Sequence, residues 1–379
     1  MSNFKLFIRN LIKAILQFCI LPLVYIFYKN RTIQENLVIF ADSKNNGIPY
    51  SMLAMYETVK HTNKYEIKVL CIDYSKLSIL EKVEAIIEFM KLYANAKYVF
   101  ICDYFLPVSS CKKRKETKVI QLWHSSGLQK KFGYDAIDDL GNIFFCKPTK
   151  NFDLVSVSSE FIKKYFVEAW KLNNENVKAF GTSRTDILFD EKYKEFCINN
   201  FYKIYPEAKN KKIILWAPTF RGNANDGKLV GIDDILEISK KMSDKYYFII
   251  KLHPHLKEKS LYDNCSLNTE NLYFVADILI TDYSSIMYDF LLLNKKIILY
   301  IPDYDSYILR RGLYVDYFSE FKFPIIKNKK ILSDFFLNDI NSIEKNPNFE
   351  NYKMKYLAAN DGLASKRILN YLLTNKLEV

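Results

Sequence analysis

The side chains best suited to chemistry in this sequence lie in turns that follow apolar runs. His124, one of four histidines in 379 residues, comes directly after the run 118–123. An imidazole at the end of a strand can take a proton from an attacking hydroxyl, which makes His124 a candidate general base. Its neighbours Ser125, Ser126 and Gly127 are candidate substrate contacts. A lone histidine beside a tryptophan is also compatible with a purely structural role.

Four cations suit an anionic ligand because each lies in or beside such a turn. They are Arg184, Arg221, Lys251 and Arg311. Several cations that converge on one site would stabilise a diphosphate and the charge that develops on its leaving group. Each cation alone has a plainer interpretation as a solvated surface charge.

A further turn joins an apolar run to a helical pattern, and it consists of Thr281, Asp282, Tyr283, Ser284 and Ser285. Serine and threonine are good helix caps, and the free amides of a first helical turn attract anions, so a phosphate would fit here. A capping sequence without any ligand explains the same residues equally well. The sequence has neither a Walker lysine nor a GxGxxG, which excludes the P-loop and dinucleotide fingerprints.

Two histidines, His253 and His255, follow another apolar run. His253 could donate to a phosphate oxygen, which makes it the second candidate catalytic residue. A metal site at this pair is the weaker interpretation, because two histidines separated by one residue make a poor metal site by themselves. Asp303 and Asp305 form a DxD pattern, but a loop with solvent-facing acids accounts for it as well. We therefore expect no metal requirement.

The turns need a scaffold, and the pattern between them predicts one. Short runs rich in Val, Ile and Phe alternate with helical patterns such as 77–96, which indicates βαβ units. The expected strands are 37–43, 66–73, 97–103, 118–123, 153–158 and 177–181, then 211–218, 246–254, 272–275, 277–282 and 296–303. We therefore predict an α/β fold with two doubly wound domains, in which ligands bind beyond the carboxyl ends of the strands.

The composition is that of a globular protein, with 49% hydrophobic and 26% charged residues and a formal charge of +12. Such a charge suits nucleic acid, an anionic membrane or a phosphorylated substrate. No recognisable RNA- or DNA-binding motif is present, so we expect no nucleic-acid partner. Seven cysteines without CxxC spacing argue against a disulfide framework and a zinc site, and predict reduced, mostly buried thiols in the cytoplasm.

The N-terminus has the pattern of a membrane-associating helix. Residues 14–28 are strongly apolar but fall short of the about 20 residues that a spanning helix needs. Lys5, Arg9 and Lys13 would form a basic stripe on a helix that lies in the membrane interface. We expect residues 1–30 to hold the protein peripherally on the cytoplasmic side of the cell membrane, against its anionic inner surface. An uncleaved span and an ordinary core helix are the alternatives.

Together the turns resemble those of the CDP-glycerol glycerophosphotransferase family, the teichoic acid primases and polymerases of bacterial envelopes. The matching pieces are Trp123-His124-Ser125-Ser126-Gly127 with Lys131 and Gly133, Gly181-Thr182-Ser183-Arg184-Thr185-Asp186, Ala217-Pro218-Thr219-Phe220-Arg221, Lys251-Leu252-His253-Pro254, Thr281-Asp282-Tyr283-Ser284-Ser285 with Asp289, and Arg311-Gly312-Leu313-Tyr314. Their order and spacing hold over residues 118–316. The chain departs from the common motifs of the family at Ser125-Ser126-Gly127 and at Thr182-Ser183. These positions relate to which acceptor or polyol the enzyme uses.

The resemblance implies a GT-B-like fold, with two Rossmann-type domains that face a cleft. An acceptor-side domain over 31–195 and a CDP-donor domain over 205–330 would be followed by C-terminal helices over 331–379. The implied enzyme transfers glycerol phosphate or a related polyol phosphate from CDP-glycerol or CDP-ribitol to a hydroxyl of a lipid-linked glycan or a teichoic or capsular polymer, and releases CMP. The short chain resembles a primase or a compact transferase.

The resemblance also implies residue roles. His124 would be the general base and His253 would contact the donor's pyrophosphate. The turn 281–285 and Arg311 would hold the nucleotide's phosphates, with Thr219 and Gly312 as further substrate contacts. Two alternatives remain: a GT-B glycosyltransferase that uses a nucleotide sugar, and a non-catalytic basic protein that binds a membrane surface or nucleic acid.

Overall fold

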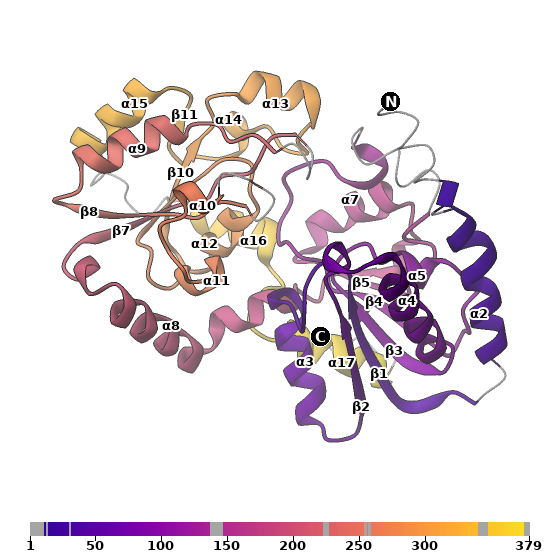
Figure 1. Cartoon of the computed structure of the whole chain (residues 1–379). Coiled ribbons are helices and arrows are strands. Elements are labelled where there is room, and N and C mark those ends of the chain that lie inside the picture. The colour runs from indigo at the N-terminus through magenta and orange to yellow at the C-terminus, as the bar shows by residue number, and fades with distance from the viewer. Residues whose placement is uncertain are drawn as a thin grey trace. The chain divides into compact units, whose positions relative to one another are not determined.

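The computed structural model describes residues 11, 12, 14–29, 32–136, 147–222, 227–253, 256, 259–339 and 348–374 (Figure 1). The chain divides into two compact units. The first contains residues 1–125, 132–186 and 358–379, and the second contains 126–131 and 187–357. His255 and the basic residues Lys5, Arg9 and Lys13 lie outside the described residues.

A parallel sheet forms the centre of the first unit, with the strand order β2-β1-β3-β4-β5-β6 in the described residues (Figure 1). The strands are β1 (Gln34–Asp42), β2 (Glu66–Cys71), β3 (Ala96–Ile101), β4 (Lys118–Gln121), β5 (Leu154–Ser156) and β6 (Val177–Lys178). The chain runs outward from β1 to β2 and returns to β3 on the other side of β1. The point where the strand order reverses therefore lies between β1 and β3, and ligands of such sheets bind at this point.

The helices of the first unit include α2 (Leu21–Tyr28), α3 (Tyr50–His61), α4 (Ile79–Tyr93), α5 (Leu106–Ser109), α7 (Glu160–Trp170) and α17 (Ala364–Thr374). Shorter turns of 3-10 or π-helix are η1 (Leu16–Ile20), η2 (Tyr74–Lys76), η3 (Gly133–Asp135), η4 (Asn174–Asn176) and η5 (Ser183–Phe189). Ser78 begins α4 with a capping box to Glu81, which satisfies two amides of the first turn. The last helix, α17, packs against α3, and its Ile368 joins the core formed by strand residues such as Phe40 and Phe100.

The second unit also has a parallel sheet, with the order β11-β10-β9-β7-β8 in the described residues. Its strands are β7 (Lys212–Trp216), β8 (Tyr246–Ile250), β9 (Ile278–Thr281), β10 (Lys296–Tyr300) and β11 (Ile325–Ile326). Because β8 and β9 follow each other in sequence but flank β7 on opposite sides, the order reverses between β7 and β9. The predicted α/β architecture with two parallel sheets is confirmed.

One predicted strand, 272–275, is wrong. Residues Thr269–Leu272 form the short helix α11, and the amide of Ala276 donates to the carbonyl of Leu272 in a helix-like turn. The side chains of 272–275 are nevertheless buried. A short apolar run has the same pattern whether a strand or a helical turn buries it, so periodicity could not separate the two.

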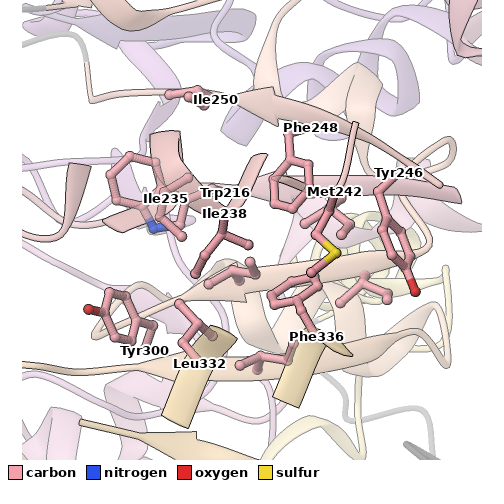
Figure 2. Close-up of a cluster of buried hydrophobic side chains, with 14 of the residues drawn as sticks. Trp216, Ile235, Ile238, Met242, Tyr246, Phe248, Ile250, Tyr300, Leu332 and Phe336 are labelled. Carbon is pink, nitrogen blue, oxygen red and sulfur yellow. The ribbon is translucent and has the colours of Figure 1, made fainter. Parts of the chain in front are cut away.

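Helices and turns complete the second unit. They are α8 (Glu191–Ile204), η6 (Pro206–Ala208), α9 (Ile232–Lys241), α10 (Lys259–Tyr262), α11, α12 (Ile286–Leu292), α13 (Tyr304–Arg310), α14 (Tyr317–Glu320), α15 (Lys329–Asp334), η7 (Phe335–Asp339) and α16 (Phe349–Leu357). The core on one face of the sheet joins Trp216 and Phe248 to Ile235 of α9 and Leu332 of α15 (Figure 2). This apolar layer supports the strands whose carboxyl ends carry the polar turns.

The N-terminal helix α2 lies against α4 (Figure 1). Leu21 and Tyr25 are buried there, whereas Leu23 and Phe27 are 67% and 75% exposed. Within the described residues, the structure contains no helix that is both long and apolar enough to cross a membrane. The cysteines in the described part are free, and all of them except Cys19 are buried, as predicted.

Candidate active site

The first group of site residues lies at the carboxyl edge of the first sheet, beside its reversal point. Lys44 follows β1, Asp103 follows β3 and His124 follows β4. The Nδ1 atom of His124 is 3.8 Å from the Asp103 carboxylate and 3.4 Å from the carbonyl oxygen of Cys102. The Lys44 ammonium binds the same carboxylate. We call His124, Asp103 and Lys44 the histidine cluster.

Gln121, the last residue of β4, holds the two turns of this cluster together. Its buried side chain donates to the carbonyl oxygen of Asp103 at 3.1 Å and accepts from the amide of Trp123 at 2.9 Å. Trp123 has a left-handed backbone with φ of 59°, so the strand ends at Gln121, two residues earlier than predicted. The sharp bend places the His124 ring 4.1 Å from the indole ring of Trp123.

The protonation of His124 follows from its neighbours. A carbonyl oxygen can only accept, so Nδ1 donates to it and Nε2 is left unprotonated in the neutral ring. Burial lowers the pKa of His124, and the charges of Lys44 and Arg184 lower it further, while Asp103 opposes them. The side chain is still 47% exposed. The imidazole is therefore neutral at neutral pH, with an accepting nitrogen, as a general base requires.

Asp103 stays ionised in this setting. Burial alone would raise its pKa, but two charges outweigh burial and lower it: His124, which is protonated in the acid range where Asp103 would titrate, and Lys44. Asp103 is a site residue that the sequence motifs did not reveal. The only signal was its place as the last residue of the predicted strand 97–103. Sequence alone could not show that β3 and β4 are neighbours.

Arg184 also belongs to the first unit, where its guanidinium lies 5.5 Å from the ring of Tyr50. The turn around it docks the end of the chain. Asp186 accepts from the first amides of α17 at Ala364 and Ser365, at 3.0 and 2.7 Å. Gly181 has φ of 92°, and a Cβ there would lie 2.3 Å from the carbonyl oxygen of Ala359. Much of this motif therefore has a structural use.

The second group lies at the reversal point of the second sheet; we call Arg221 and the residues around it, Asp282, Tyr283, Asp303 and Tyr307, the Arg221 group. The Arg221 guanidinium donates to Asp303 at 2.6 and 2.9 Å and binds Asp282 at 2.8 Å. It also lies 4.9 and 5.0 Å from the rings of Tyr283 and Tyr307, which stack on each other at 3.6 Å. Arg221 is thus fixed by two carboxylates and two aromatic faces.

The turn 281–285 is built around the same guanidinium. Asp282 accepts from the amides of Thr219 and Tyr283 at 2.8 and 2.6 Å, and the hydroxyl of Thr281 donates to the carbonyl of Ala217 at 2.7 Å. Ser284 and Ser285 are half-buried, and Ser285 precedes α12 without a side-chain capping bond. Thr281 and Asp282 therefore shape the turn and hold Arg221.

Lys251 and His253 follow β8. Because β8 ends at Ile250, Lys251 lies just beyond the strand and not inside it as predicted. Its ammonium binds Asp263 at 3.0 Å and the carbonyl of Cys265 at 2.9 Å. The ring of His253 lies 4.6 Å from Phe220, in the turn that carries Arg221. The structure thus places His253 near the Arg221 group and engages Lys251 in an ion pair of its own.

Residues 126–131, which we call the strap, belong to the second unit although the residues before and after them belong to the first. Gly127 packs so closely on Tyr288 that a Cβ there would lie 2.4 Å from the ring. The amide of Tyr314 donates to the carbonyl of Gln129 at 2.8 Å, and the amide of Lys131 donates to the carbonyl of Gly312 at 3.2 Å. The strap therefore runs beside the segment that follows Arg311, and Ser125 stays with the first unit.

The two aspartates of the DxD pattern have different surroundings. Asp303 faces Arg221, whereas Asp305 is 87% exposed and lies 3.5 Å from Lys327. In the part of the chain that the structure describes, no group of three or more His, Cys, Asp or Glu side chains is arranged to hold a metal ion.

A family model of CDP-glycerol:poly(glycerophosphate) glycerophosphotransferases matches residues 23–374. The chain belongs to this family. The match extends well beyond residues 118–316, which carried the resemblance in the sequence, and it confirms that resemblance.

Relatives of this glycerophosphotransferase family member include two enzymes of Bacillus spizizenii. Over 97% of its length the chain is 32% identical to a teichoic acid poly(ribitol-phosphate) polymerase, of which it spans 60%. It is 28% identical to a teichoic acid ribitol-phosphate primase, with 90% of the chain and 91% of the primase covered. A teichoic acid glycerol-phosphate primase of Bacillus subtilis is 30% identical over 76% of both chains. Relatives of the chain thus include ribitol-phosphate and glycerol-phosphate enzymes.

Solved structures share the fold of this family member. The wall teichoic acid polymerase TagF superposes with a TM-score of 0.72 at 18% identity, covering 99% of the chain and 98% of TagF. A UDP-GlcNAc 2-epimerase from Neisseria meningitidis superposes with a TM-score of 0.58 at 17% identity, covering 89% of this chain and 99% of the epimerase. At these identities the likeness concerns the fold alone.

Proposed function

We propose that the protein transfers a polyol phosphate from a CDP-activated donor, CDP-glycerol or CDP-ribitol, to a hydroxyl of a teichoic acid-type acceptor, and releases CMP. The observation that carries the proposal is a neutral histidine with an accepting Nε2, held by Asp103 in a chain that the family model matches from residue 23 to 374. A solved TagF variant soaked with CDPG is consistent with a CDP-polyol donor. The lipid-linked form of the acceptor is part of the proposal.

In the proposed reaction the acceptor oxygen attacks the phosphorus that bears the polyol. Its proton passes to Nε2 of His124, the new acceptor O–P bond forms, and the bond between that phosphorus and the CMP oxygen breaks. Charge develops on the leaving CMP, where Arg221 and Arg311 would stabilise it. Chemistry of this kind depends mainly on positioning and electrostatics, which suits a guanidinium as firmly held as Arg221.

The direct test is CMP release by the full-length protein with a teichoic acid primer on its lipid carrier. We expect acceptor-dependent CMP release with CDP-glycerol, with CDP-ribitol or with both, and transfer of the labelled polyol phosphate to the acceptor. UDP- and CMP-sugars serve as the comparison donors. Turnover with a nucleotide sugar and none with either CDP-polyol would replace the proposal with a glycosyltransferase.

Asp103→Asn should lower kcat by about 10- to 100-fold, because the amide cannot orient or stabilise the imidazolium as the carboxylate does. The Asp103 charge raises the pKa of His124 in the wild type, so its removal lowers that pKa further. The acid limb of the kcat/KM profile should therefore move to lower pH. A loss of kcat with an unmoved acid limb would contradict the pairing of Asp103 with His124.

We propose in addition that the N-terminal segment docks the protein peripherally on the cytoplasmic face of the cell membrane. The support is a set of exposed apolar side chains on two helices that pack together, α2 and α4. Leu23 and Phe27 of α2 are 67% and 75% exposed, and Ile79 and Leu80 at the start of α4 are 79% and 76% exposed. An interfacial helix buries such side chains at the boundary of headgroups and acyl chains.

Vesicle sedimentation tests this docking. We expect the protein to bind vesicles that contain phosphatidylglycerol, with binding weakened by the double substitution Leu23→Asp, Phe27→Asp. Leu261→Asp, which also changes a 75% exposed leucine but lies in the second unit, is the matched control. Equal binding by all three proteins would argue against the segment as the docking surface.

A further inference from the structure

Lys130, in the strap, is not among the residues that the sequence motifs single out. Its backbone forms an isolated antiparallel bridge with Leu313, flanked by the hydrogen bonds of Gln129 with Tyr314 and of Lys131 with Gly312. The position of Lys130 is therefore determined by the backbone on both sides. Its side chain is half-buried.

The ammonium of Lys130 lies within electrostatic reach of the Arg221 group. The pKa of Lys130 is lowered to about 8, mainly by burial; the charges of Arg311 and Arg221 add to this shift, and that of Asp282 opposes it. Within the described residues the ammonium makes no hydrogen bond or ion pair, while Asp282 already accepts from Arg221 and two amides. Both carboxylates, Asp282 and Asp303, bind Arg221, so the Lys130 ammonium has no ion-pair partner among the described residues.

A second, independent feature of the same region is an unused hydroxyl. The Oγ1 atom of Thr219 is buried and has no hydrogen-bond partner among the described residues. The amide of Thr219 donates to Asp282, so this hydroxyl belongs to the same turn. A buried hydroxyl without a partner costs free energy unless a ligand or water satisfies it. A hydroxyl and the Lys130 ammonium are together the donors that a phosphate oxygen requires.

We propose that Lys130 binds the diphosphate of the donor, and that its ammonium offsets charge on the departing CMP. This inference rests on the proposed function, because it names a further residue of the same site. It also gives the strap a role. This short segment follows the general base in sequence, belongs to the second unit, and supplies a residue that binds the CDP-activated donor. The left-handed Gly127 and Gly312 permit the close approach that brings the strap there.

Titration of CDP into the full-length protein tests the inference without requiring turnover. Lys130→Gln should weaken CDP binding by roughly 10- to 100-fold, the loss expected for a charge-assisted hydrogen bond, and should leave the weaker binding of cytidine unchanged. Lys240→Gln makes the same charge change at the end of α9, at the opposite edge of the sheet, and should bind CDP as the wild type does.

The pH dependence gives a readout that a structural role would not move. The wild type should lose CDP affinity above about pH 8, as Lys130 becomes neutral, because a terminal phosphate with a pKa near 6 keeps its charge there. The charged groups that act on Lys130 are Asp282, Arg311 and Arg221. Despite burial, Asp282 and Asp303 raise the pKa of Arg221, so its guanidinium stays charged throughout this range. Lys130→Arg should bind CDP and abolish this alkaline loss.

The outcomes separate the two proposals. A wild type that neither binds CDP nor releases CMP from any CDP-polyol would remove the proposed function. If the wild type does both, the Lys130→Gln variant decides the second proposal. A variant that is folded, as its thermal transition shows, and that binds CDP within twofold of the wild type would overturn the role of Lys130 alone. An alkaline loss that persists unchanged in Lys130→Arg would also overturn it.

Discussion

His124→Ala is expected to lower kcat for CMP release by roughly 100- to 10,000-fold, the usual contribution of a general base. The substitution removes Nε2, the ring nitrogen that accepts the proton, whereas the donor site of the second unit is untouched. CDP should therefore bind with unchanged affinity. Single-turnover measurement of CMP release, together with CDP titration, separates the chemical step from binding.

The pH profile of the wild type provides a second check on His124. Because the pKa of its imidazole is lowered below 6.5, the base stays neutral down to a lower pH than an ordinary histidine. The acid limb of kcat/KM should accordingly lie below pH 6.5 and disappear in His124→Ala. His61→Ala is the matched control, since His61 is 79% exposed on α3, and its activity should equal that of the wild type. Wild-type kcat in His124→Ala would refute the general-base assignment.

Arg221→Met is expected to destabilise the second unit by about 3–5 kcal/mol, because it leaves Asp282 and Asp303 without their common cation. Both carboxylates are largely buried, with side chains 4% and 19% exposed. The substitution also removes the cation that lies against the stacked rings of Tyr283 and Tyr307. Hydrogen exchange of the β7 and β9 amides measures the loss in this unit.

Two further variants show whether the uncompensated charge is the cause. Arg221→Met combined with Asp303→Asn removes one of the stranded carboxylates and should recover part of the stability. Lys194→Met breaks an exposed pair with Glu191 on α8, 2.9 Å apart, and should change stability by no more than about 1 kcal/mol. A cost for Arg221→Met as small as that for Lys194→Met would contradict the ion-pair network.

The local sequence pattern could predict which functional side chains directly follow a strand. Val, Ile and Phe runs mark the strands because they pack on pleated surfaces, and the polar residues after them must then lie at the carboxyl edge. His124, Arg221 and Asp282 were found in this way. The same reasoning misplaced the ends of β4 and β8 by a few residues, since a strand's last residue depends on its neighbours in the sheet.

The partners of those side chains depend on contacts distant in sequence. Asp103 meets His124 because β3 and β4 pair, and Arg221 meets Asp282 because β7 lies beside β9 and not only beside β8. Lys251 has a sequence position as favourable as that of Arg221, but Asp263 binds its ammonium. Residue type and spacing cannot distinguish these cases, because the pairing energy comes from groups 12 to 82 residues apart.

By itself the sequence determined the alternation of strands and helices, the turns that carry His124 and the cations, and the family to which they belong. Tertiary structure alone decided the order of strands within each sheet, the docking of α17 on the first unit and the membership of the strap in the second. The physical reason is that periodicity records only which face of an element is buried. Which neighbour buries it, and which charge it meets there, is decided by packing between segments far apart in the chain.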